Sequence, residues 1–114
     1  MPENCLFCRI ARGELPTELL LETEHVVAFR DINPVAPTHI LVIPKKHVPS
    51  LAGLEPEDQA LMGELMAAVK ELAEQEGLSS GYRVVANTGS DGGQSVNHLH
   101  FHLLGGRSLQ WPPG

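Results

Sequence analysis

The stretch His98-Leu99-His100-Phe101-His102 places three imidazoles at every second position, with apolar residues between them. Successive side chains of a β-strand point to opposite faces of the sheet. We therefore predict a strand over residues 97–104 in which the three histidines share one face while Leu99 and Phe101 enter the core. The alternative is an ordinary amphipathic strand whose polar face happens to be histidine, and the strict alternation after a glycine-rich loop argues against it.

The spacing of these histidines limits what they do together. Residues four apart in a strand are separated by about 13 Å, at about 3.3 Å per residue. A zinc–nitrogen bond is only about 2.0–2.1 Å long, so one ion can bind two of these side chains but hardly all three. At least one imidazole therefore has another role. A histidine that titrates near neutral pH is best suited to act as a nucleophile or as an acid–base group.

A glycine-rich loop, Gly89-Ser90-Asp91-Gly92-Gly93-Gln94-Ser95, comes just before the histidines. Glycine lets backbone N–H groups approach a ligand closely, and consecutive N–H groups with serine hydroxyls suit phosphate oxygens. The loop lacks the Gly-Lys-Ser/Thr of a P-loop and does not lead into a helix as a dinucleotide fingerprint does. Alone it is a weak signal, but its junction with three aligned histidines favours a phosphate site.

The rest of the chain predicts several strands and one long helix. Apolar residues recur at helical spacing between Glu55 and Glu76, where Pro56 suits the first turn and Gly77 the C-terminal cap. This stripe, methionines included, is interpreted as core that covers a sheet; its members are Leu61, Met62, Leu65, Met66, Val69, Leu72 and Ala73. A short helix over residues 5–12, a rigid proline-flanked loop and four more strands are also predicted, the strands over 18–22, 25–31, 38–44 and 82–88.

These elements predict the α+β class: an antiparallel sheet of about five strands with one long central helix and a short N-terminal helix. The 114 residues have the length of one domain, and the chain contains no repeat or linker. We therefore expect a single domain over residues 1–114.

Charge and composition argue against several classes of protein. Fourteen acidic residues against eight Lys and Arg give a formal net charge of −6 without a basic stripe, which makes the chain a poor nucleic-acid binder. No apolar run approaches the roughly 18 residues that cross a bilayer. The beginning Met1-Pro2-Glu3-Asn4 lacks the basic-then-apolar pattern of a secretory signal. We expect a cytoplasmic protein that binds neither nucleic acid nor membrane.

Cys5 and Cys8, the only cysteines, form a Cys-x-x-Cys motif near the beginning of the sequence. A thioredoxin-type redox pair follows a strand, for which four residues leave no room, and a structural disulfide is uncommon in a cytosolic chain. Half of a zinc site fits better, because thiolates at this spacing hold one ion while two further ligands come from elsewhere. Two free helix cysteines remain the alternative.

Taken together, these motifs resemble the histidine triad (HIT) family and, within it, the Hint branch. The resemblance runs from about Cys5 to the last residue. It is carried by the histidine stretch, residues 87–96, residues 29–32, residues 36–47 and the ending Trp111-Pro112-Pro113-Gly114. It implies a HIT-like fold and a homodimer with two sites. Each site would hydrolyse a purine nucleoside phosphoramidate (adenosine 5′-phosphoramidate, or an aminoacyl- or lysyl-AMP compound) to the nucleoside monophosphate and an amine.

The resemblance also implies a role for each catalytic residue. By match to the family motif, His100 is the nucleophile that attacks the α-phosphorus and forms a nucleotidyl-histidine intermediate, which water then cleaves. Its other ring nitrogen needs a fixed acceptor, expected to be a nearby backbone carbonyl. His102 and Ser95 are candidates to assist the leaving amine, and His39 lies where the family keeps a histidine near the nucleophile. Related uridylyltransferases have Gln in place of His102, so His102 favours hydrolysis over transfer.

For nucleotide binding, the resemblance assigns the ribose hydroxyls to Asp31, beside Ile32. The apolar base pocket corresponds to Phe7, Ile10 and Phe29. The phosphate contacts correspond to Asn87, Gly93, Gln94, Ser95 and His102. Trp111 is expected to reach the site of the other subunit; a frayed aromatic tail is the alternative.

The metal ligands, too, come from the resemblance. Many bacterial triad proteins use the cysteine pair as zinc ligands, and by that match Cys5, Cys8, His47 and His98 form a Cys₂His₂ site. Four protein ligands leave no open position, so the zinc would be structural and catalysis would need no cofactor. Two other functions stay open: a nucleotide-binding interaction module with incidental hydrolase activity, and a zinc-dependent hydrolase.

Overall fold

The central strand of the sheet is β3 (Thr38–Pro44), and all seven of its residues are buried. Its run of Ile, Leu and Val suits a strand that is covered on both faces. The computed structural model describes residues 4–114, and there the five antiparallel strands lie in the order β1-β2-β3-β5-β4. The other strands are β1 (Leu21–Glu22), β2 (Val26–Arg30), β4 (Tyr82–Val85) and β5 (Phe101–Gly105). The predicted α+β class with a five-stranded antiparallel sheet is confirmed.

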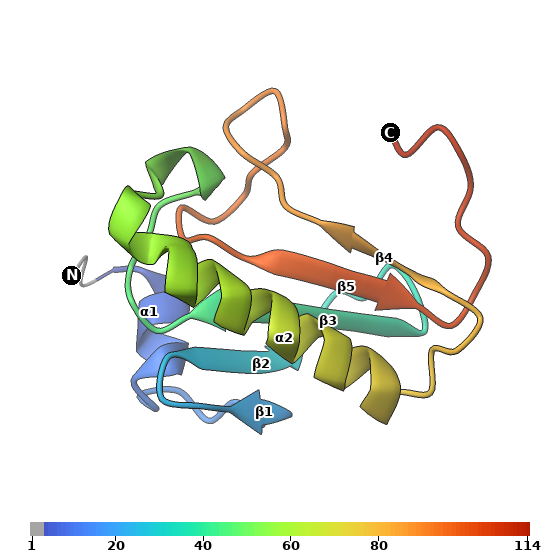
Figure 1. The fold of residues 1–114 in the computed structure, drawn as a ribbon, viewed down its shortest axis with the longest axis horizontal. Helices are drawn as coiled ribbons and strands as arrows, with labels where there is room; N and C mark the ends of the chain where they lie inside the picture. The colour runs from blue at the N-terminus through green and yellow to red at the C-terminus, as the bar shows by residue number, and fades with distance from the viewer. Residues whose placement is uncertain (1–3) are drawn as a thin grey trace.

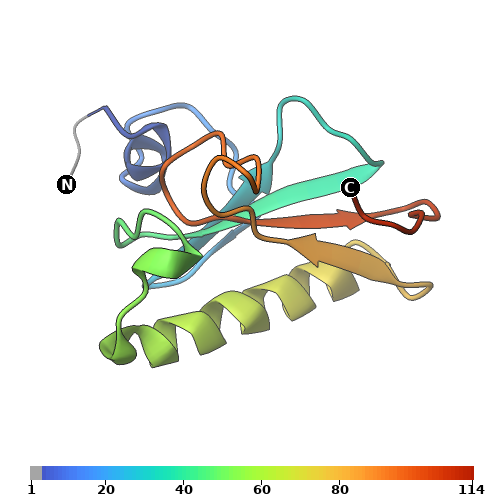
Figure 2. The same cartoon turned by 90° about the horizontal axis from the view of Figure 1, so that it is seen from above.

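Helices cover the sheet on both sides. The long helix α2 (Gln59–Gln75) lies across one face, and the short helix α1 (Leu6–Ala11) lies on the other, together with the loop that precedes β5 (Figures 1 and 2). The side chains of β3 alternate between two cores, as the pleat requires. Ile40 and Val42 pack under α2, whereas Leu41 and Ile43 pack under α1.

The predicted helix over residues 55–76 is divided in the structure. Pro56–Asp58 forms a 3₁₀ turn before α2, and a second 3₁₀ turn lies at Leu51–Gly53. Pro56 fits the first turn because a helix leaves its first N–H groups unpaired, and the Asp58 carboxylate accepts the Glu55 N–H at 2.9 Å. The interpretation of both methionines as core is wrong for Met66, which is 40% exposed at the margin of the apolar stripe.

The strand predicted over residues 97–104 begins only at Phe101. The reason is that other hydrogen bonds replace those of the ladder there. The ring of His98 donates from Nε2 to the Pro44 carbonyl at 2.8 Å, and the Leu99 N–H donates to Val48 O at 2.6 Å. Leu99 and Phe101 nevertheless enter the α2-side core. The predicted alternation of histidine and apolar side chains is therefore confirmed although the ladder is shorter.

Three other strands are shorter than predicted: their paired residues are 21–22, 26–30 and 82–85. Within residues 4–114 no helix is long and apolar enough to cross a bilayer. The expectation about a secretory signal concerns Met1, Pro2 and Glu3, which lie outside the described residues.

Candidate active site

A cavity of about 340 Å³ opens between α1 and the sheet. This volume lies within the range typical of small-molecule sites. Eight residues predicted to bind nucleotide line it: Phe7, Ile10, Phe29, Asp31, Ile32, Ser95, His100 and His102. A larger cavity of about 600 Å³ lies at another part of the sheet, and its lining contains no candidate site residue.

One wall of the cavity is apolar. The rings of Phe7 and Phe29 meet edge to face with centroids 5.6 Å apart, and Phe7 also contacts the His100 ring at 5.1 Å. Phe7 and Ile10 come from α1 and Phe29 from β2, so the wall forms only when the helix docks on the sheet. Ile32 is 91% exposed and lies at the rim.

Sequence reasoning missed six lining residues, namely Leu6, Leu15, Thr17, Arg30, Leu41 and Val96. Leu41 could have been found. It lies on the α1-side face of β3 and pairs with His102 in the register of β3 and β5. Leu15 and Thr17 follow α1 in a segment without regular structure. No local pattern in the sequence signals their place in the cavity wall.

His100 is buried, and one of its ring nitrogens has a fixed partner. The Nδ1–H donates to the backbone carbonyl of His98 at 2.7 Å. A carbonyl oxygen only accepts, so Nδ1 carries a proton, and in the neutral form of the ring Nε2 keeps its lone pair. This is the backbone acceptor that the sequence analysis expected. A neutral imidazole with a free Nε2 on a cavity wall is suited to nucleophilic attack.

His39 and His102 form a second pair of imidazoles beside His100. His39 Nε2 lies 2.9 Å from His102 Nδ1, and the nearer Asp31 oxygen lies 3.4 Å from His39 Nε2. Burial lowers the pKa of His102 to about 4, and the neighbouring His100 and His39 act in the same direction. Burial also lowers the pKa of His39. Both rings are therefore neutral at pH 7.

The glycine-rich loop is held together by the side chain of Gln94. Its amide nitrogen donates to Pro49 O and Val96 O, and its oxygen accepts the Gly89 N–H. The backbone N–H groups of Gly93 and Gln94 also bond within the loop. Neither residue lines the cavity, and Asn87 does not either. Phosphate contacts by these three residues stay a prediction.

Trp111 lies away from the cavity of its own chain. Its side chain is 80% exposed, and the Arg83 guanidinium carbon lies 6.0 Å from the ring centroid. Contact of the indole with another subunit stays a prediction.

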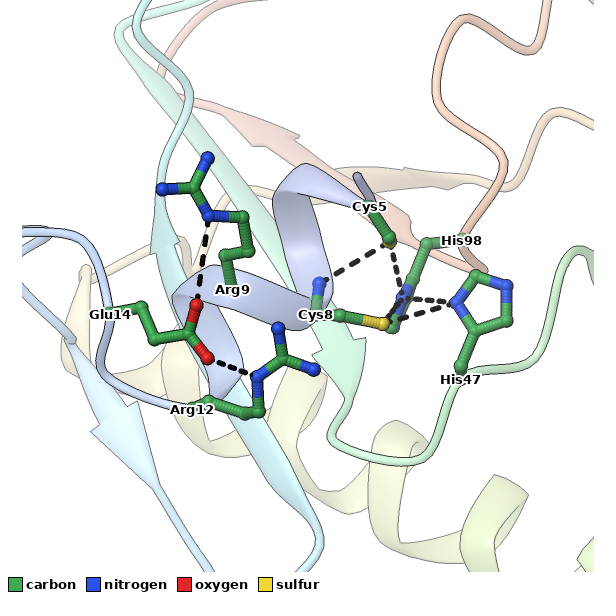
Figure 3. A network of polar contacts seen from close by, with 7 residues as sticks. All are labelled: Cys5, Cys8, Arg9, Arg12, Glu14, His47 and His98. Atoms are coloured by element: carbon green, nitrogen blue, oxygen red, sulfur yellow. Dashed lines mark hydrogen bonds and ion pairs between the residues drawn. The ribbon is translucent and has the colours of Figure 1, made fainter. Parts of the chain in front are cut away.

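Cys5, Cys8, His47 and His98 converge at one end of α1, as Figure 3 shows. Their sulfur and Nδ1 atoms are 3.2–3.5 Å apart in the four close pairs and all lie within 4.8 Å of one another. A tetrahedral zinc ion sets two nitrogen or sulfur ligands about 3.3–3.8 Å apart. The donor types and the spacing therefore fit a Cys₂His₂ zinc site.

The protonation of His98 and Cys8 bears on cation binding by the cluster. His98 donates its Nε2–H to the Pro44 carbonyl, which leaves the Nδ1 lone pair facing the two sulfurs. Burial and the nearby Cys5 raise the pKa of the Cys8 thiol to about 11, while burial lowers the pKa of His98 to about 4. Both groups are neutral in this environment, and a bound cation would favour the thiolate.

Comparisons with known proteins identify the family of the chain. The model of the HIT domain matches residues 12–109. The chain belongs to the HIT domain family. An uncharacterized HIT-like protein of Synechococcus elongatus is 54% identical to it over 114 residues, which is the full length of both chains.

Solved structures of the family have the same fold. The HIT family hydrolase from Legionella pneumophila Philadelphia 1 superposes with a TM-score of 0.95 at 51% identity, covering 97% of this chain and 100% of the other. A histidine triad protein from Clostridium difficile superposes with a TM-score of 0.93 at 43% identity, covering 96% of each chain. The HIT-like fold predicted from the sequence is thus confirmed.

The low pKa of His102 predicts a pH-dependent loss of stability. Between pH 6.5 and about 4, the unfolded chain binds a proton on this side chain and the native protein does not. Stability therefore rises with pH in this window and falls as the pH is lowered. We expect the wild type to lose up to about 1.4 kcal/mol per pH unit relative to His102→Gln. Urea unfolding of both proteins at several pH values measures this difference. The same dependence of the unfolding free energy on pH in both proteins would contradict the prediction.

Proposed function

We propose that the chain is a purine nucleoside phosphoramidate hydrolase of the Hint branch, which releases a nucleoside monophosphate and an amine. Adenosine 5′-phosphoramidate and aminoacyl- or lysyl-AMP compounds in which an amine nitrogen is bonded to phosphorus are the substrates proposed. The observation that carries this proposal is His100, whose Nδ1–H is bound to the His98 carbonyl while Nε2 is free on the cavity wall. The ending Trp111-Pro112-Pro113-Gly114 supports the Hint branch within the family.

The reaction runs in two displacements at phosphorus. In the first, the Nε2 lone pair of His100 forms a bond to the α-phosphorus, and the phosphorus–nitrogen bond of the substrate breaks. The amine leaves with the electron pair of that bond and takes up a proton. In the second, water attacks the phosphorus, its proton passes to solvent, and the lone pair returns to Nε2. Two such steps replace one difficult displacement.

The cavity suits the other parts of a nucleotide. Its apolar wall of Phe7, Ile10 and Phe29 offers aromatic and aliphatic surface for a purine, and Ile32 at the rim extends it. Asp31 lines the same cavity, with one oxygen bound to the Asn33 N–H, so its carboxylate is oriented to accept from ribose hydroxyls. Ser95 lines the same cavity as His100 and His102, where its hydroxyl can assist the leaving amine.

His100→Ala tests the nucleophile. We expect it to reduce hydrolysis of adenosine 5′-phosphoramidate by at least about 1000-fold, because the covalent route is lost. Acid-quenched wild-type protein should carry one nucleotide on His100, detected by mass spectrometry. His25→Ala is the matched control, because His25 is exposed, pairs with Glu64 and does not line the cavity.

The same assay separates the proposal from the interaction-module alternative. A module with incidental activity would bind nucleotide tightly while its turnover stayed the same across different amine leaving groups. Rapid turnover without an adduct, or full activity in His100→Ala, would contradict the proposed mechanism.

We further propose that Cys5, Cys8, His47 and His98 hold a structural zinc ion. The ion would fasten α1, which carries Phe7 and Ile10, to the segment that carries His98 and His100. A closed set of four protein ligands leaves no position for a reacting water, so catalysis itself needs no cofactor. The proposal is supported by the donor set and by ligand-atom spacings near those of tetrahedral zinc.

Cys8→Ser tests the zinc site. We expect the wild type to contain about one zinc per chain by elemental analysis and the variant to contain little. Loss of the ion should lower Tm by about 10 °C or more, since about 2 kcal/mol corresponds to such a shift in a chain of this size. Wild-type protein without zinc in spite of correct folding would refute the site. If metal-free, folded protein still turns over substrate, a zinc-dependent hydrolase is excluded.

We also propose a homodimer in which the β4 edges of two chains meet. Among the described strands, β4 pairs only with β5, so its outer edge is open. Tyr82 and Val84 on this strand are 45% and 38% exposed. Unpaired edges with apolar side chains tend to associate. Trp111 would then reach the nucleotide site of the second copy.

Val84→Lys tests this interface. Two facing lysines at an apolar edge should weaken association by about 100-fold, so the variant sediments as a monomer at concentrations where the wild type is a dimer. Met66→Lys is the control, because Met66 is similarly exposed but lies on α2. A Val84→Lys variant that stays dimeric would mean that another surface associates.

A further inference from the structure

The protonation of His39 is set by a backbone group outside the cavity. The Val35 N–H donates to His39 Nδ1 at 3.1 Å. A ring nitrogen that accepts a hydrogen bond carries no proton, and a neutral imidazole has one proton in all. The proton of neutral His39 therefore lies on Nε2.

This assignment determines the tautomer of His102. His39 Nε2 lies 2.9 Å from His102 Nδ1, so the Nε2–H of His39 donates and His102 Nδ1 accepts. The proton of neutral His102 consequently lies on its own Nε2. That atom is buried and has no hydrogen-bond partner within residues 4–114, and the side chain lines the cavity. A buried N–H without a partner is unfavourable, and a hydrogen bond to a bound ligand would satisfy it.

We propose that the Val35 N–H acts through His39 to hold His102 as a neutral Nε2–H donor to a phosphoryl oxygen of the substrate. Val35 and His39 are thus positioning residues, and His102 is the group that touches the substrate. The inference rests on the proposed function for the identity of that oxygen, but the tautomers themselves belong to the protein without substrate.

This chain of hydrogen bonds lets His102 donate a hydrogen bond but does not let it transfer a proton to the leaving amine. If His102 gave up its Nε2 proton, Nδ1 would have to take one from His39. His39 would then need a new proton on Nδ1, where the Val35 N–H already points. An amide does not release its proton at neutral pH, so the relay ends there. The leaving amine therefore takes its proton from water, either directly or through the Ser95 hydroxyl.

The same reasoning argues against a metal ion at Asp31, His39 and His102, whose ligand atoms lie within 4.8 Å of one another. A metal on His39 Nε2 would displace the only proton of that ring, because Nδ1 accepts from Val35. The ring would then be an imidazolate anion. The cluster at α1 has no such conflict, since His98 keeps its proton on Nε2 and faces the sulfurs with Nδ1.

The loop that carries Val35 is held in place from the C-terminal segment. Arg107 donates to the Val35 carbonyl at 2.9 Å. A Cβ at Gly106 would lie 2.8 Å from the Pro37 side chain, so only glycine allows this close approach. Pro34 and Pro37 restrict the backbone on both sides of Val35. The donor is therefore fixed by contacts that lie apart from the cavity.

Nitrogen-15 NMR of the histidine rings in the full-length protein at pH 7 tests the proposal directly, because protonated and unprotonated ring nitrogens have well-separated shifts. We expect His39 and His102 to be protonated on Nε2 and His100 on Nδ1. An Nδ1–H form of either His39 or His102 in the wild type would overturn the proposal, whatever the variants do.

Val35→Pro and Val35→Ala form a matched pair. Both remove the exposed valine side chain, but only proline removes the N–H. We expect Val35→Ala to keep the wild-type tautomers. In Val35→Pro, His39 and His102 should populate the Nδ1–H forms together. We expect kcat to fall about tenfold, a smaller decrease than the complete loss of one such hydrogen-bond donor causes. A folded Val35→Pro protein with unchanged tautomers would overturn the proposal.

Arg107→Ala provides a second variant that keeps the Val35 N–H but removes the contact that holds the loop. We expect a smaller shift toward the Nδ1–H forms, with Lys70→Ala, which loses an exposed bond to Glu74 on α2, as the control. Tautomers as proposed in a protein without phosphoramidate hydrolysis would refute the proposed function and leave the hydrogen-bond chain intact. Phosphoramidate hydrolysis by a protein with the opposite tautomers would refute the hydrogen-bond chain and leave the proposed function intact.

Discussion

The backbone carbonyl of His98 is the group on which the candidate active site depends. It accepts the Nδ1–H of His100 at 2.7 Å and so leaves the nucleophilic lone pair on Nε2. The same residue is tied by its ring to Pro44 and to the two sulfurs of α1. The position of the nucleophile is therefore coupled to the docking of the helix. Phe7 strengthens this coupling, because its ring contacts both His98 and His100.

This coupling explains what the zinc ion proposed above would contribute at this position. A chain of 114 residues buries a small core, and α1 has only six residues. Such a helix is marginal by itself, so its position depends on tertiary contacts. Two ligands on the helix and two on the sheet side would fasten the apolar wall of the cavity opposite the histidines. Structural stability and catalysis would then draw on the same few contacts.

Sequence reasoning succeeded where local physics decides and failed where distant segments meet. β3 was predicted to the residue, because a short apolar run rich in β-branched residues and ending at Pro44 favours a buried strand. The start of β5 was predicted four residues too early, because the His98 ring takes the Pro44 carbonyl and ends the ladder. The lining role of Leu15 depends on how the chain returns after α1, and no periodic pattern reports it. The bracing role of Gln94 likewise depends on Pro49, which is far away in the sequence.

The repeat of three histidines shows how identical side chains acquire different chemistry. Period two alone puts them on one face and makes them equivalent. Their partners then distinguish them: His98 gives its Nε2–H to a carbonyl and faces the thiols, and His100 gives its Nδ1–H to a carbonyl. His102 accepts at Nδ1 from His39, which in turn accepts from the Val35 amide. One ring is thus disposed to bind metal, one to attack and one to donate, and in each case the backbone decides which nitrogen is free.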